Sequence, residues 1–115
     1  MDMAANLSSR QKSIVGLSVA TAVIHIILAI LSRDDSMFLI LFILNGLGYL
    51  ALVAGLYFVP QLASQRSMIR WALLGFTAVT FVLYFVFNWP AVLNPFGLVD
   101  KLIELVLMIQ LWQEK

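Results

Sequence analysis

The chain contains no cysteine and few charged residues. None of its 115 residues is Cys, which excludes disulfide bonds, thiolate metal sites and thiol nucleophiles and leaves the redox compartment unread. Only 11% of the residues are charged, against about 25% in soluble domains. The formal net charge is +1, which argues against nucleic acid as a partner, because that binding needs many positive charges. So little charge indicates a chain built mostly for apolar surroundings.

Apolar residues fill the chain instead, and they gather in four long runs. Hydrophobic residues make up 63% of the sequence, and the mean hydropathy is +1.00. The runs lie at about 13–32, 37–59, 68–88 and 96–113. An α-helix needs roughly 20 apolar residues to cross a bilayer core. We therefore predict an all-α membrane protein, with a short polar N-terminal tail at 1–12 and a domain of four transmembrane helices at 13–115.

The connections between the runs are short, which predicts antiparallel neighbours and an up-down-up-down bundle. Five of the positive residues fall on one side of this topology, namely Arg10, Lys12, Arg66, Arg70 and Lys115. Arg33 and Lys101 fall on the other side. Because Lys and Arg are enriched on the cytoplasmic side of a membrane, we expect both termini inside, in the cytoplasmic membrane of a prokaryote.

Polar residues recur at a similar depth in all four runs. At 1.5 Å of helix rise per residue, they lie roughly 6–14 Å below the outer surface. Each would be costly if it faced lipid, so we expect the polar faces to point inward and meet in one layer. The predicted intramembrane polar cluster is His25, Asn45, Thr80, Tyr84 and Glu104.

This cluster admits more than one interpretation. The simplest is polar contact that fixes the register of the helices. A second is a binding or proton-transfer site open to the outside, since a buried Glu beside a His can exchange a proton. A third is a contact between subunits. We predict that Asp100 and Lys101 form a surface charge pair, because charges near a helix start usually reach the headgroups.

Three short motifs resemble small four-span membrane proteins of haloarchaea and some bacteria. They are a His followed by an apolar run at Val23–Leu28, a Gly-rich stretch at Asn45–Leu50, and a Pro-Phe-Gly followed by Asp-Lys within Pro95–Lys101. The resemblance implies a four-helix membrane fold and no particular chemistry. The chain is only superficially similar to small multidrug resistance transporters, which carry an essential glutamate in the first helix, whereas the deeply placed acid here is Glu104.

We predict a non-enzymatic protein with no cofactor or metal, because no catalytic set or cofactor motif is visible in the sequence. The leading interpretation is an accessory or scaffold subunit of a larger membrane complex, such as an electron-transfer complex. Its partners would be the lipid bilayer and other membrane subunits or a second copy of itself. One alternative is a small proton-coupled carrier or exporter that acts as a homodimer through Glu104 and His25. Another is a protein that binds a lipid or quinone.

Overall fold

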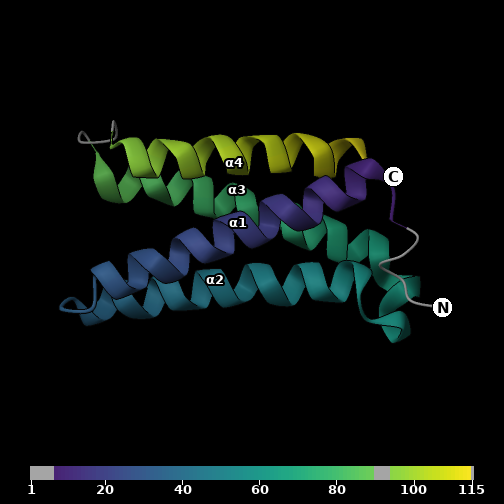
Figure 1. Cartoon of the computed structure of the whole chain (residues 1–115), viewed down its shortest axis with the longest axis horizontal. Coiled ribbons are helices and arrows are strands. Elements are labelled where there is room, and N and C mark those ends of the chain that lie inside the picture. Colours follow the sequence, from purple (N-terminus) through teal and green to yellow (C-terminus); the bar gives the residue numbers. More distant parts are fainter. Residues whose placement is uncertain (1–6, 90–93, 115) are drawn as a thin grey trace.

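The computed structural model describes residues 7–89 and 94–114 and is all-helical within them. Four α-helices and one short 3-10 helix follow one another along the chain (Figure 1). Their bounds are Ser9–Leu31 for α1, Ser36–Tyr57 for α2, Pro60–Gln65 for η2, Arg66–Asn88 for α3 and Pro95–Gln113 for α4. The four apolar runs of the sequence therefore correspond to the four α-helices.

Three segments are long and apolar enough to cross a membrane. They are Ser9–Leu31, Ser36–Tyr57 and Pro60–Asn88, in which η2 runs into α3. The fourth helix, α4, has 19 residues and contains Asp100, Lys101 and Glu104, which lower its hydropathy. By length and composition alone, the described chain thus contains three candidate spans where the apolar runs predicted four.

The helix starts follow local capping chemistry. Ser8 accepts from the Gln11 amide while the Gln11 side chain accepts from the Ser8 amide, which forms a capping box. This pair starts α1 at Ser9, four residues before the start of the first apolar run. Asp35 caps α2 and Asn94 caps α4 through their side-chain oxygens, as Asp and Asn commonly do at helix starts.

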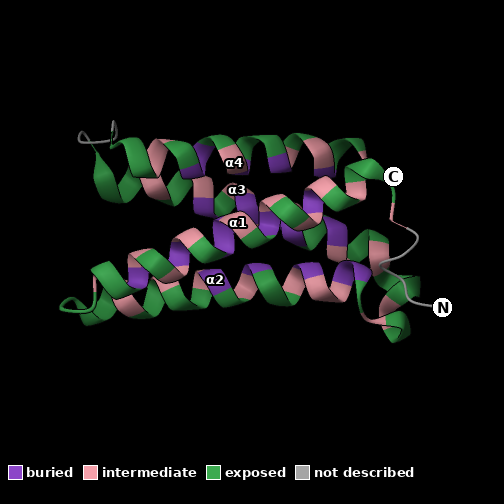
Figure 2. Ribbon diagram, in the orientation of Figure 1, coloured by how far each residue is buried: buried purple, intermediate pink, exposed green. Residues whose placement is uncertain are grey.

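The helices lie side by side, and their inward faces form one core (Figure 2). Helix α1 packs against α2 and α4, and α3 packs against α4 and α2. The start of α1 meets the end of α4, where Arg10 Nη1 lies 3.7 Å from Glu114 Oε2. We call this end of the molecule the terminal end, and the end with the α1–α2 turn the turn end (Figure 1).

The terminal end is filled by apolar side chains. Its core contains Ile14, Leu56, Tyr57, Leu73, Leu107 and Leu111, none of them more than 1% exposed. Arg70 Nη1 donates to the Leu111 carbonyl at 2.7 Å, and Arg66 Nε donates to the Leu56 carbonyl at 3.0 Å. These two carbonyls lie in the last turns of α4 and α2. Carbonyl groups in the last turn of a helix have no hydrogen-bond partner within that helix. The two arginines therefore close this end.

Candidate functional site

A cavity of about 510 Å³ lies at the turn end, between the four helices. It is partly open to the outside of the molecule. Leu28, Leu41, Phe42 and Leu83 provide apolar walls, and Ser32 and Asn94, which cap helix ends, also line the cavity. His25, Asp100 and Lys101 line its deepest part, which we call the floor. A cavity with apolar walls and a charged floor suits a ligand that is apolar at one end and polar at the other.

His25 has a defined orientation on the floor. Its Nδ1 lies 2.7 Å from the backbone carbonyl oxygen of Thr21, one turn earlier in α1. A carbonyl can only accept, so Nδ1 carries a proton and donates it. In the neutral ring, Nε2 then holds a lone pair, and this atom lies 3.7 Å from Asp100 Oδ2. The contact to Thr21 thus turns the basic nitrogen of His25 toward the floor of the cavity.

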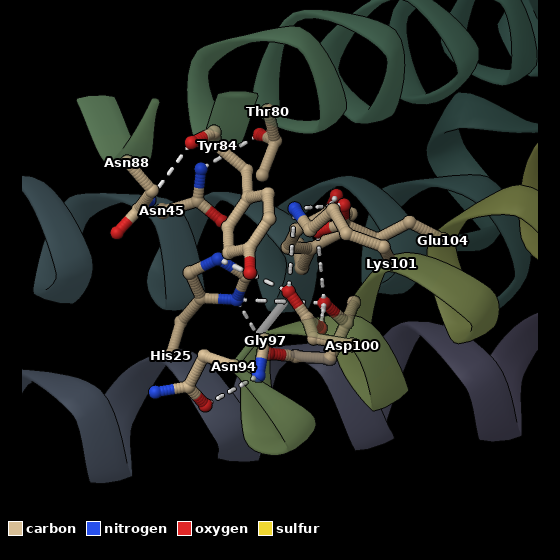
Figure 3. A network of polar contacts seen from close by, with 12 residues as sticks. His25, Asn45, Thr80, Tyr84, Asn88, Asn94, Gly97, Asp100, Lys101 and Glu104 are labelled. Carbon is tan, nitrogen blue, oxygen red and sulfur yellow. Dashed lines mark hydrogen bonds and ion pairs between the residues drawn. The ribbon is translucent and has the colours of Figure 1, made fainter. Parts of the chain in front are cut away.

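Three charged side chains of α4 meet in the protein interior (Figure 3). Asp100, Lys101 and Glu104 are 2%, 5% and 0% exposed. The Lys101 ammonium donates to Glu104 Oε1 and lies 3.5 Å from Asp100 Oδ2. Two carboxylates therefore face one ammonium, and removing charges from water is favourable only when they are paired and hydrogen-bonded.

Neighbouring hydroxyl groups complete the environment of the carboxylates. The Thr21 hydroxyl donates to Asp100 Oδ1 at 2.6 Å and lies 3.3 Å from Glu104 Oε2. The Tyr49 hydroxyl donates to the same Glu104 oxygen at 3.3 Å. Helices α1, α2 and α4 thus share one hydrogen-bonded network beneath the cavity, and such a network fixes the rotation of α4.

Helices α2 and α3 contribute a polar wall. Asn45 Nδ2 donates to Thr80 Oγ1 at 2.7 Å, while Asn45 Oδ1 is buried and has no hydrogen-bond partner. The Lys101 ammonium lies 5.1 Å from the centre of the Tyr84 ring, within the range of a cation–π contact. A Cβ atom added to Gly97 would come within 2.5 Å of that ring, so the absence of a side chain at Gly97 lets α4 approach α3.

The structure brings the predicted polar cluster together around one centre (Figure 3). His25, Asn45, Thr80 and Tyr84 line the cavity. Glu104 does not line it but lies just beneath, bonded to Lys101 of the floor.

Asp100 and Lys101 form the predicted charge pair, 3.5 Å apart, but the predicted surface location is wrong. Both side chains are buried, because the inward face of α4 continues from them through Glu104, Leu107 and Leu111. The rotation of α4 turns the pair into the protein, where Glu104 and His25 provide the contacts that water would otherwise supply.

Tyr49 belongs to the site although the sequence analysis did not select it. It lies one helical turn after Asn45 on the same face of α2, and that spacing is the signal that could have found it. The sequence also suggests the segment 89–96 as part of a lipid-binding site, and residues 90–93 of that segment lie outside the described residues.

His25, Asp100 and Glu104 are the residues that could hold a metal ion. Each offers one ligand atom, and the three atoms lie within 4.8 Å of one another. Imidazole and carboxylate suit several divalent metals. However, the Lys101 ammonium pairs with both carboxylates, so this side chain already supplies the positive charge that a metal would bring.

Comparisons with family models, with curated proteins and with solved structures find no match for this chain. The resemblance to small four-span proteins and the accessory-subunit interpretation therefore stay predictions.

Proposed function

We propose that the chain is an integral membrane protein that binds an amphipathic small molecule, lipid-like or quinone-like, in the cavity at the turn end. The observation that carries this proposal is the cavity itself, with apolar walls above a buried, charged floor. Its volume of about 510 Å³ falls within the usual range of small-molecule pockets. Charged groups inside a membrane protein are costly and commonly mark a binding or transport site.

All four α-helices cross the membrane in this proposal, including α4. Its three charged side chains point into the protein, whereas Val99, Leu102, Leu105 and Ile109 are exposed. The surface that α4 would turn to lipid is therefore apolar, although its average composition is not. An up-down-up-down topology with both termini in the cytoplasm follows from the distribution of Lys and Arg, and it opens the cavity toward the outer side.

The absence of cysteine allows a clean test of this topology. A single cysteine replaces Asp34 in the α1–α2 turn or Ser64 in η2, both exposed, and intact cells are treated with a membrane-impermeant maleimide. We expect labelling of the Asp34→Cys variant from outside and labelling of the Ser64→Cys variant only after the cells are opened. The reverse pattern would invert the orientation, and equal labelling from outside would contradict the spans.

Binding is tested with two neighbouring positions of α1. Leu28 lines the cavity, whereas Ile27 is exposed on the outer surface. After extraction in mild detergent, native mass spectrometry should detect a bound lipid-like molecule on the unaltered chain and on the Ile27→Trp variant. The Leu28→Trp variant should lose it, because the indole would occupy the cavity. Preparations that are empty throughout, or equal occupancy in both variants, would refute binding in the cavity.

A proton-coupled carrier remains a second candidate because Glu104 lies directly beneath the floor. Its contact with Lys101 connects it to the cavity, so a proton on Glu104 would change the charge next to a bound molecule. The Glu104→Gln variant should then lose transport while it keeps its fold, and unchanged transport would exclude this mechanism. The same native mass spectra would reveal a larger complex if the chain is an accessory subunit.

A further inference from the structure

The floor of the cavity has more hydrogen-bond acceptors than donors. His25 Nδ1 donates to the Thr21 carbonyl, so the lone pair of the neutral ring is on Nε2. Asp100 Oδ2 lies 3.7 Å from Nε2, and a carboxylate oxygen has no hydrogen to donate to it. That oxygen is itself an acceptor, with only the Lys101 ammonium nearby, at 3.5 Å.

A second acceptor without a donor lies on the wall of the same cavity. Asn45 Oδ1 is buried with no hydrogen-bond partner, while its Nδ2 donates to Thr80. A buried acceptor left without a donor costs roughly 1–3 kcal/mol. His25 on α1 and Asn45 on α2 therefore both lack a hydrogen-bond donor, and both side chains line the cavity that a ligand would fill.

The charges around these acceptors restrict the head group of the ligand. An anionic head would face the carboxylates of Asp100 and Glu104. A cationic head would compete with the Lys101 ammonium for the same Asp100 oxygen. A head group that only accepts hydrogen bonds could meet the Lys101 ammonium, but it would leave His25 Nε2 and Asn45 Oδ1 without a donor. A neutral head group that donates a hydrogen bond fits all of these restrictions.

We infer that the cavity binds a molecule with a hydroxyl head group and an apolar tail, the hydroxyl donating to the acceptor pair of His25 Nε2 and Asp100 Oδ2. This inference rests on the proposed function, because it requires that the cavity be a binding site. Phenols, hydroquinones and long-chain alcohols share this chemistry. The walls of Leu28, Phe42 and Leu83 would contact the tail.

The test compares two probes that differ in one hydrogen-bond donor. Nonylphenol and its methyl ether, nonylanisole, have the same tail and ring, and only the phenol can donate. Calorimetric titration of the full chain in nanodiscs, with empty nanodiscs as blank, should show binding of the phenol roughly tenfold tighter or more, as expected for a hydrogen bond to a charged acceptor.

Two variants should change this preference for the phenol, each by altering one of the two acceptors. In Asp100→Asn, the Thr21 hydroxyl holds the amide oxygen at the Oδ1 position, so the amide nitrogen replaces Oδ2 and donates to His25 Nε2. In His25→Leu, the acceptor nitrogen is removed outright. We expect the two probes to bind equally to the Asp100→Asn variant, whereas the His25→Leu variant keeps the Asp100 carboxylate and should only reduce the preference for the phenol. The Ile27→Val variant is the control, because Ile27 is exposed on the outer surface of α1 and does not line the cavity; it should keep the preference.

The outcomes separate this inference from the proposed function. Equal binding of both probes to the unaltered chain, a preference that survives in the Asp100→Asn variant, or an undiminished preference in the His25→Leu variant would overturn the hydroxyl inference and leave cavity binding intact. Tighter binding of an alkylammonium with the same tail length would overturn it in favour of a cationic head. If neither probe binds above the empty nanodiscs, the proposed function fails and the inference fails with it.

Discussion

The space between the four helices is filled differently at the terminal end and at the turn end. At the terminal end, large apolar side chains such as Leu73, Leu107 and Tyr57 fill the space between the helices, and Arg70 and Arg66 close it by donating to free carbonyls. At the turn end, the helices enclose a cavity of about 510 Å³ above a charged floor. Both regions lie between the same four helices, so the difference comes from side chains and not from the fold.

This contrast indicates which end is built for stability and which for binding. A cavity forfeits the dispersion contacts that its lining would otherwise make, and a buried charge costs free energy even when it is paired. The turn end has both the cavity and the buried charges, and the terminal end has neither to the same extent. A region that keeps such costly features next to a well-packed one is the expected place for a ligand site.

The largest expected loss of stability comes from removing the ammonium group of the charged floor. Replacing Lys101 by Met leaves Asp100 and Glu104 buried without their ammonium, and removal of one partner of a buried ion pair costs about 3–5 kcal/mol. We expect a loss of that order in the free energy of unfolding, measured by denaturant titration in mixed micelles.

Two variants sharpen this prediction. Adding Glu104→Gln to Lys101→Met removes one of the unpaired charges and should restore a large part of the stability. Arg33→Met removes an exposed cation at the same end and should change stability little. A Lys101→Met variant as stable as the Arg33→Met variant would mean that the ion cluster does not hold the turn end together.

The next effect compares one truncation at each end. Leu107 is fully buried at the terminal end, so Leu107→Ala creates a new void and should cost about 2–5 kcal/mol. Leu28 already borders the cavity, so Leu28→Ala only enlarges an existing space and should cost about 1 kcal/mol. The same unfolding titration measures both variants. Equal losses at the two positions would show that the turn end is packed as tightly as the other.

The sequence predicts the helices better than it predicts their rotation. Apolar runs locate α1 to α4 to within a few residues, because length and hydropathy are properties of the sequence alone. Depth arithmetic also selected His25, Asn45 and Glu104, since helix rise converts residue number directly into height. The depth of a residue in the membrane can therefore be predicted from its position in an apolar run.

Rotation depends on contacts with other helices, and this is where the prediction for Asp100 and Lys101 went wrong. Near a helix start, a charged side chain can reach the headgroups or turn inward, and local sequence does not distinguish the two. The partners that draw these side chains inward, Thr21 and His25, lie on another helix far along the chain. The spacing of Asp100, Glu104, Leu107 and Leu111 on one face was the available signal.

The smallest expected effect tests whether the start of α1 matters to the terminal end. Ser8 and Gln11 form the capping box that begins this helix, and the Gln11 side chain also donates to Glu114 Oε1 at 3.1 Å, which joins the start of α1 to the end of α4. Ser8→Ala should cost about 1 kcal/mol, the usual value for a lost N-cap. Ser9→Ala, one residue into the helix, is the matched control and should be close to neutral. Because the cap lies at the terminal end, the Ser8→Ala variant should bind nonylphenol as the unaltered chain does; weaker binding would show that the two ends are coupled through α1.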